Sequence, residues 1–313
     1  MKLSSGHTST RYESKQHGSA EFPYAVYRSL IPDIMHSYPL HWHNEMEITY
    51  ILNGSCIISV NGTPIRALTG DIILILPNQL HSIDRDGNCR AEYYTFVFDL
   101  YLLGQDSPSD ACFRKYLKPY LDGGAVLPLR LFSKHTDYAS IRQSLEELLK
   151  LEKPECQAAP MQGRELLIKA RLFHIFGLLE PYRNDTDSDA ALCQIAQIQK
   201  MKALLHFISV NYMNPLTLQE AASFCGYSAS YFMKFFKSFT SLTFVEYLNH
   251  YRLEKASELL RATDLTVLVV SENVGFENHS YFIRIFKRQY GITPRKYRLL
   301  HRESAVLSDT GSI

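Results

Sequence analysis

The feature that most constrains this chain is a repeat within its last third. The stretch GYSASYFMKFFKSFTSLTFVEYL, which begins at Gly226, aligns with GFENHSYFIRIFKRQYGITPRKYR, which begins at Gly275 and carries one inserted residue. A match of this length with a single insertion indicates a duplicated structural unit. The pairs that are identical at an offset of 50 positions are Ser230/Ser280, Tyr231/Tyr281, Phe232/Phe282, Phe236/Phe286, Lys237/Lys287, Thr243/Thr293 and Tyr247/Tyr297.

Each copy has the pattern of two helices joined by a short turn. In the first copy Thr217 and Ser228 are typical N-cap residues, and Gly226 is typical of a helix end. The helix after Ser228 has an aromatic stripe expected to face inward and a polar, basic stripe expected to face outward. The inward positions are Phe232, Phe235, Phe236 and Phe239, with Phe282, Ile285 and Phe286 in the second copy; the outward positions are Ser230, Met233, Lys234 and Lys237, with His279, Ser280, Ile283, Arg284, Lys287 and Arg288 in the second copy.

Residues 243–263, between the two copies, have apolar residues at helical spacing and predict one long helix. Two exposed helices held about 34 Å apart by such a spacer would enter successive major grooves of DNA. The charge agrees with a polyanionic partner, because residues 194–313 hold 14 Lys and Arg against 9 Asp and Glu, whereas residues 1–193 hold 19 against 23. The alternative is a plain helical bundle with a basic surface. A basic outer face in both copies argues against that alternative.

Residues 194–302 resemble the DNA-binding domain of the AraC/XylS family of bacterial transcriptional regulators. The motifs that carry the resemblance are Gly226-Tyr227-Ser228, Ser230-Tyr231-Phe232, Phe236-Lys237, Val274-Gly275-Phe276, Ser280-Tyr281-Phe282, Phe286-Lys287 and GITPRKYR. The resemblance implies that base edges are read by Ser230, Met233, Lys234, His279, Ser280, Ile283 and Arg284. Lys237 and Lys287 are expected to contact phosphates. The chain departs from the family at Ser271, where Ala is usual, and at Val269, where an acid is frequent.

Residues 22–100 have short segments rich in Ile, Val, Tyr and Phe that are separated by turn signals, such as Asn61-Gly62 between two apolar runs. Many short, evenly spaced strands indicate a small sandwich or barrel. Residues 111–182 predict amphipathic helices, which must each bury one face. These helices are expected either to cover the β domain or to pair with a second copy of the chain. Their apolar positions are Ile141, Leu145, Leu148 and Leu149 in one helix and Leu166, Leu167, Ala170, Phe173 and Leu178 in the other.

The run HWHNEMEITYILNG brings His41, His43 and Glu47 together, and GDIILILPNQLH adds His81. The two runs resemble the two motifs of cupin barrels, which many AraC/XylS regulators carry as a sensor ahead of the DNA-binding domain. In metal cupins the equivalent side chains hold one ion, and three imidazoles with a carboxylate suit Fe(II), Mn(II), Ni(II) or Zn(II). The resemblance to the regulators implies instead that these side chains contact an organic effector, often a sugar, without metal, and Trp42 would offer a packing or stacking surface. A third alternative is that the histidines are only hydrogen-bonded wall residues. We therefore expect an effector site without metal or other cofactor, formed by His41, Trp42, His43, Glu47 and His81.

The fold class expected from these patterns is a two-domain α+β protein. An N-terminal cupin-like β-barrel with a helical layer is followed by an all-α domain in which a long helix joins two helix-turn-helix motifs. The expected divisions are a flexible arm at 1–21, an effector-binding and dimerisation domain at 22–182, a linker at 183–193, the DNA-binding domain at 194–302 and a tail at 303–313.

These features predict a cytoplasmic, ligand-responsive transcriptional regulator rather than an enzyme. Its expected partners are double-stranded DNA, a small-molecule effector such as a carbohydrate, a second copy of the chain and, if it is an activator, RNA polymerase. No membrane partner is expected, because no apolar run is long enough to span a bilayer. Six scattered cysteines without a CxxC pair fit a reducing compartment. The alternatives are a metal-dependent cupin enzyme and a DNA-binding protein whose barrel only dimerises.

Overall fold

The computed structural model of the chain describes residues 12–13, 16–32, 37–152, 161–186 and 189–300. The chain divides into two compact units. The first ends at Gln199 and the second begins at Lys200. The helix α4, Asp189–Asn211, begins within the expected linker and continues into the second unit. Most of the expected arm and the whole expected tail lie outside the described residues.

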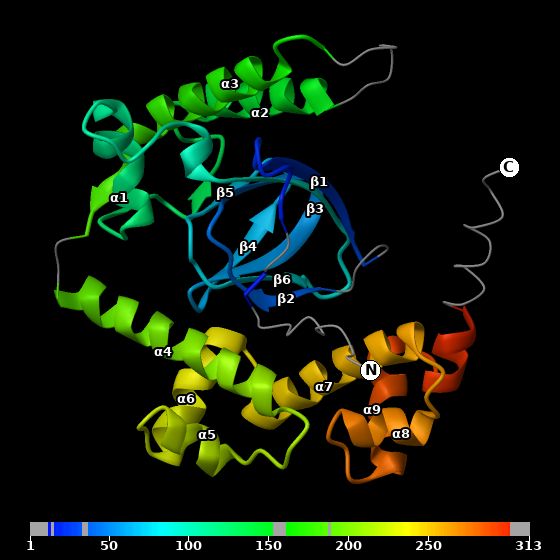
Figure 1. Cartoon of the computed structure of the whole chain (residues 1–313). Coiled ribbons are helices and arrows are strands. Elements are labelled where there is room, and N and C mark those ends of the chain that lie inside the picture. Colours follow the sequence, from blue (N-terminus) through cyan, green and yellow to red (C-terminus); the bar gives the residue numbers. More distant parts are fainter. Residues whose placement is uncertain (1–11, 14–15, 33–36, 153–160, 187–188, 301–313) are drawn as a thin grey trace, which may run out of the picture. The chain divides into compact units, whose positions relative to one another are not determined.

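The first unit is built around a curled β-sheet (Figure 1). The long strand β3 pairs with β7 and β5 through its first half and with β4 and β6 through its second half, so it belongs to both sides of the barrel. The neighbours in the main path of the sheet are β1-β7-β3-β5-β9, and β2 pairs with β6. The strands are β1 Tyr24–Ile31, β2 Tyr38–His41, β3 Met46–Val60, β4 Thr63–Leu68, β5 Ile72–Ile75, β6 His81–Arg85, β7 Ala91–Phe98, β8 Ala125–Val126, β9 Arg130–Leu131 and β10 Asn184–Asp185.

The turn between β3 and β4 consists of Asn61 and Gly62, as the sequence predicts. Both residues have positive φ angles, 49° and 82°, and Val60 pairs with Thr63 across the turn. A two-residue turn of this kind matches the right-handed twist of the strands that it joins. The pairing register of β3 with β4 follows from it, and with that register the alternation of buried and exposed residues.

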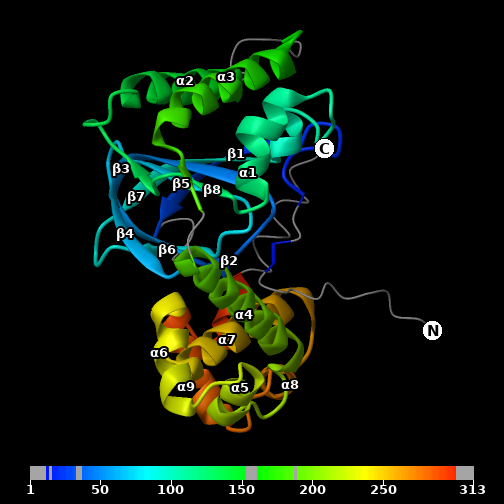
Figure 2. The same cartoon turned by 90° about the vertical axis from the view of Figure 1, so that its left-hand side faces the viewer.

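Helices α2, Tyr138–Glu152, and α3, Arg164–Leu179, lie side by side over one face of the sheet (Figures 1 and 2). Their buried side chains form one core with side chains of the sheet, including Ile48, Leu74 and Phe96. The expected helical layer is therefore confirmed. Its other elements are η1 Leu100–Leu102, η2 Phe113–Leu117, α1 Lys118–Leu121 and η3 Glu180–Tyr182.

The buried face of α3 differs from the one expected from the sequence. The side chains of Leu166, Leu167 and Phe173 are exposed at 73%, 38% and 41%, whereas Ile168, Leu172, Ile175, Phe176 and Leu179 are buried. The expected face is wrong because this helix carries apolar residues on nearly all sides, so several stripes of helical spacing fit the sequence equally well. Leu166, Leu167 and Phe173, called the exposed stripe of α3 below, therefore present large apolar side chains to solvent.

The second unit is helical and contains two helix-turn-helix units joined by the long helix α7. Phe236 and Tyr247 pack edge to face with their ring centroids 5.3 Å apart, and their counterparts Phe286 and Tyr297 do so at 5.4 Å. The repeat found in the sequence is therefore a repeat of core packing. The helices are α5 Leu218–Phe224, α6 Ala229–Thr240, α7 Phe244–Ala262, α8 Val267–Asn273 and α9 His279–Tyr290.

The turn in the second helix-turn-helix unit requires a glycine. Gly275 has a φ of +87°, and a Cβ atom there would lie 2.7 Å from the carbonyl oxygen of Tyr212. The positive φ and the close approach both exclude larger residues. In the first helix-turn-helix unit Thr217 and Ser228 cap α5 and α6, as expected. Within the described part of the chain no helix is both long and apolar enough to cross a bilayer.

Candidate functional site

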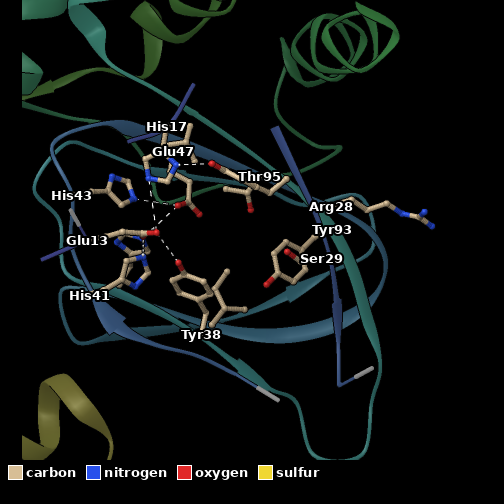
Figure 3. Close-up of a pocket in the computed structure, with 14 residues that line it drawn as sticks. Glu13, His17, Arg28, Ser29, Tyr38, His41, His43, Glu47, Tyr93 and Thr95 are labelled. Carbon is tan, nitrogen blue, oxygen red and sulfur yellow. Dashed lines mark hydrogen bonds and ion pairs between the residues drawn. The ribbon is translucent and has the colours of Figure 1, made fainter. Parts of the chain in front are cut away.

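The barrel of the first unit encloses a cavity of about 200 Å³. Three imidazoles, those of His41, His43 and His81, line it together and are called the histidine cluster below. Their exposed fractions are 7%, 2% and 1%, so all three rings are removed from solvent. Figure 3 shows His41 and His43 on one side of the cavity with Glu13, His17 and Glu47, and Ser29 and Tyr93 on the other side.

Backbone carbonyl groups orient all three rings of the histidine cluster. The Nδ1 atoms of His41, His43 and His81 lie 2.8, 3.2 and 2.9 Å from the carbonyl oxygens of residues 39, 45 and 79. A carbonyl oxygen only accepts, so each Nδ1 carries the donated hydrogen. In a neutral ring the lone pair is then on Nε2. One ring nitrogen from each member of the cluster lies within 4.8 Å of those of the other two.

Glu47 extends from β3 into the same group. Its Oε2 lies 3.4 Å from Nε2 of His43 and 3.4 Å from Nε2 of His81. Its Oε1 accepts a hydrogen bond of 2.8 Å from the hydroxyl of Thr49. The carboxylate is thus fixed by a second contact, as is usual for groups that hold a charged ligand.

Burial and the neighbouring charges set the protonation of the cluster. Burial lowers the pKa of His41 well below its ordinary value, and the charge of His81 lowers it further. Burial also lowers the pKa of His43, but hydrogen bonds with the Glu45 and Glu47 carboxylates outweigh it and raise that pKa to about 9. Burial raises the pKa of Glu47, but the imidazoles of His43 and His81 outweigh it and hold the pKa well below the ordinary value. Glu47 is therefore ionised beside a neutral His41.

The segment before the barrel contributes side chains that sequence reasoning missed. Glu13 accepts a hydrogen bond of 2.9 Å from the hydroxyl of Tyr38, and its other oxygen lies 3.5 Å from Nε2 of His41. Nδ1 of His17 lies 3.0 Å from the hydroxyl of Tyr27. Both Glu13 and His17 line the cavity. The only signal in the sequence was two ionisable residues in a polar stretch, which does not distinguish a buried contact from a solvated one.

Trp42 was expected in the effector site with its two neighbours, but the structure places it elsewhere. Its ring packs against that of Tyr12, with the centroids 6.0 Å apart, and it is absent from the cavity lining. Residues adjacent in an extended chain point to opposite faces. The side chains of His41 and His43 therefore share the cavity side, while Trp42 faces away.

In the second unit, the residues expected to contact DNA lie on α6 and α9. Ser230, Met233, Lys234 and Lys237 are exposed on α6, and Ser280, Arg284 and Lys287 are exposed on α9. His279 and Ile283, which were expected to face outward, are half-buried. The aromatic residues beneath both helices are buried, as predicted.

Arg284 is held in place by an aromatic neighbour. Its guanidinium lies over the ring of Tyr281, 5.3 Å from the centroid. The hydroxyl of Tyr281 accepts a hydrogen bond of 3.1 Å from the side chain of Asn249 on α7. An arginine that is stacked in this way loses less freedom when it forms a pair of hydrogen bonds with a base.

Both units of the chain are similar to known protein families. Residues 23–176 match the family described as AraC-like ligand binding domain, and residues 221–299 match the one described as Helix-turn-helix domain. The uncharacterized HTH-type transcriptional regulator YdeC of Bacillus subtilis is 25% identical over 92% of this chain and 96% of its own length. The melibiose operon regulatory protein of Escherichia coli is 24% identical over 84% of each protein.

Several solved structures are similar to part of the chain. The C-terminal domain of the two-component response regulator yesN from Fusobacterium nucleatum is 35% identical and covers 32% of this chain and 98% of that chain, with a TM-score of 0.31.

A DNA-binding helical unit with two helix-turn-helix motifs and a ligand-binding barrel together define a transcriptional regulator that carries its own sensor domain. The chain belongs to the AraC family of transcriptional regulators. It is not an enzyme, and the alternative of a cupin enzyme finds no support among its relatives.

Proposed function

We propose that the barrel cavity binds a small, polar effector and that binding changes how the regulator engages DNA. The observation that carries this proposal is the group of buried polar side chains, the histidine cluster with Glu13 and Glu47, around a cavity of about 200 Å³. Pockets for drug-sized ligands have about 300–1,000 Å³, so the effector is small. Several hydroxyl groups, including those of Ser29, Tyr38 and Thr95, line the same cavity. A carbohydrate fits this lining, and a relative is named for the melibiose operon.

The response to the effector follows from the segment around Glu13 and His17. Because both residues line the cavity, a ligand there would favour one arrangement of this segment over another. The coupling between effector and DNA is then the difference in affinity of the effector for those two arrangements. The segments that would move when the effector binds are residues 1–21 and 183–193.

Base recognition is assigned to exposed positions of α6 and α9. Ser230, Met233, Lys234, Ser280 and Arg284 would reach base edges in two major grooves, while Lys237 and Lys287 contact phosphates. His279 and Ile283, which are half-buried, would touch DNA at the edge of α9.

A homodimer is proposed through the exposed stripe of α3. Leu166 and Phe173 lie seven residues apart and are therefore on one side of the helix. Large apolar side chains grouped on a surface are typical of an interface. The regulator would act in the cytoplasm and, where it activates transcription, contact RNA polymerase.

The experiment measures melting temperature and DNA affinity of the full chain against a panel of monosaccharides, disaccharides and small hydroxy acids. An effector should raise the melting temperature in a saturable way and shift the affinity for DNA. Tyr93→Phe removes a hydroxyl from the cavity wall and should weaken that response. Tyr101→Phe makes the same change at a side chain that is 54% exposed, and it should leave the response intact. Compounds that stabilise both variants equally, or bind without any change in DNA affinity, would count against the proposal.

A further inference from the structure

The histidine cluster presents more acceptors than donors to one point in the barrel. The three Nδ1 atoms are already used by backbone carbonyl oxygens. The Nε2 atoms of His43 and His81 therefore face the carboxylate of Glu47, and one ring nitrogen of His41 lies within 4.8 Å of a ring nitrogen of each of these two histidines. Nε2 of His81 is fully buried and forms no hydrogen bond with any part of the chain that the structure describes. A buried polar atom without a hydrogen bond is unfavourable, and such atoms in native proteins frequently mark the place of an ion or a ligand.

The contact between His41 and Glu13 also brings two hydrogen-bond acceptors together. Nε2 of His41 lies 3.5 Å from a carboxylate oxygen of Glu13, although both atoms are acceptors while the ring keeps its hydrogen on Nδ1. A cation between such groups turns repulsion into attraction. One divalent ion would interact favourably with the imidazoles and the carboxylate at once.

We propose that the histidine cluster and Glu47 bind one divalent transition-metal ion. Histidine ligands usually bind a metal through Nε2 while Nδ1–H is held by a hydrogen-bond acceptor, and the carbonyl contacts of all three rings match that arrangement. Three of them with a carboxylate suit Zn²⁺, Fe²⁺, Co²⁺ or Ni²⁺ rather than Mg²⁺ or Ca²⁺, which prefer oxygen ligands. This proposal differs from the metal-free site expected from the sequence.

The metal would also define the class of effector. This step rests on the effector function proposed above. Three imidazoles and one carboxylate leave coordination positions free on an ion that takes five or six ligands. Hydroxyl or carboxylate oxygens of the effector would fill them, so the effector would be a small molecule with oxygen donors. Glu13, next to His41, would sense the charge of the ion from the N-terminal segment.

The test uses untagged, full-length protein that has been stripped with a chelator and desalted. Zn²⁺ or Co²⁺ alone is then added, and the metal retained after a second desalting step is measured by elemental analysis. The protein should retain close to one ion per chain, Co²⁺ should give the visible absorption of a nitrogen-ligated ion, and the melting temperature should rise. Retention far below stoichiometry, without a shift in melting temperature, would overturn the proposal.

Variants assign the ligands. His81→Ala should weaken Co²⁺ binding by roughly 100-fold or more, because the loss of even an outer contact costs 10–100-fold. Glu47→Gln keeps the size of the side chain, so it serves if the alanine variant does not fold, and it should also lose the metal. His135→Ala changes a histidine outside the cavity and should bind as wild type does. Equal retention by wild type, His81→Ala and Glu47→Gln would contradict the assignment.

The metal and effector proposals fail separately. Metal retention is measured without effector or DNA, so it does not depend on whether any panel compound binds. A stripped protein that still gives the full effector response would refute the metal-anchored effector while leaving the cavity proposal standing. A metal-loaded protein that responds to no effector would refute the effector function while leaving the metal site standing.

Discussion

The hydroxyl oxygen of Ser271 on α8 lies 3.0 Å from Nδ1 of His279, the first residue of α9. Ser271 is fully buried, and its hydroxyl donates a hydrogen bond of 2.7 Å to the carbonyl oxygen of Leu268. Because that hydrogen is used, the oxygen accepts from Nδ1–H of His279. The serine that departs from the family pattern therefore joins the two helices of the second helix-turn-helix unit, and Nε2 of His279 is left as an acceptor.

Ser271→Ala should lower the free energy of unfolding by about 0.5–1.5 kcal/mol, the net value of one hydrogen bond. It should also weaken specific DNA binding more than non-specific binding, since α9 loses a contact that orients it. Chemical denaturation and a mobility-shift titration measure the two effects. Ser209→Ala, which removes a hydroxyl bonded only to its own helix, should have little effect on DNA binding. Equal losses in the two variants would refute the role of Ser271.

Arg284→Ala should weaken specific binding by about 1–3 kcal/mol and relax selectivity at one base pair, because a stacked arginine can form two hydrogen bonds with guanine. Lys237→Ala and Lys287→Ala should weaken binding to all sequences. Each should reduce the slope of log affinity against log salt concentration by about one. Titrations on specific and random DNA at several salt concentrations separate these patterns. If all three variants behave alike on both DNAs, Arg284 is no base reader.

Residues 194–313, expressed alone, should fold and bind DNA without effector. Truncation at residue 194 keeps residues 194–211 of α4, and these include the buried side chains of Met201, Leu204, Leu205 and Ile208. The aromatic cores of both helix-turn-helix units are also retained. Circular dichroism and a mobility-shift assay provide the measurement. An unfolded fragment would mean that the cut passes through a shared core.

Leu166→Glu should convert a dimer of the full chain into a monomer, because it places a charge in the exposed stripe of α3. Leu52→Glu, at an apolar residue of β3 that is 40% exposed, is the matched control and should remain dimeric. Light scattering after gel filtration gives both masses. A monomeric wild type, or a dimeric Leu166→Glu variant, would place the interface elsewhere or remove it.

The second unit could be predicted closely from the sequence because its signals are local. The stripe of Phe232 and Phe236 recurs at Phe282 and Phe286 with polar residues between, so only one face can be buried. Capping residues and turn glycines then set the helix ends. The half-buried position of His279 was missed, because it depends on its partner Ser271 in the preceding helix.

The barrel was less predictable because its site is assembled from distant segments. His41 and His81 are partners across the pairing of β2 with β6, which no local pattern reports. Glu13 reaches the cavity from a polar stretch without periodicity. For α3, apolar residues on nearly every side left the buried face undetermined. In each of these cases the missing information was a long-range contact.

The most direct test of DNA recognition by two helices is the selection of bound sequences from a random DNA pool by the full-length protein, with Arg284→Ala selected in parallel. The wild type should enrich two short blocks about 10–10.5 base pairs apart, one for each of α6 and α9. The variant should lose information in one block and keep the other. Enrichment of a single block, or of no sequence at all, would contradict the claim that both helix-turn-helix units read DNA.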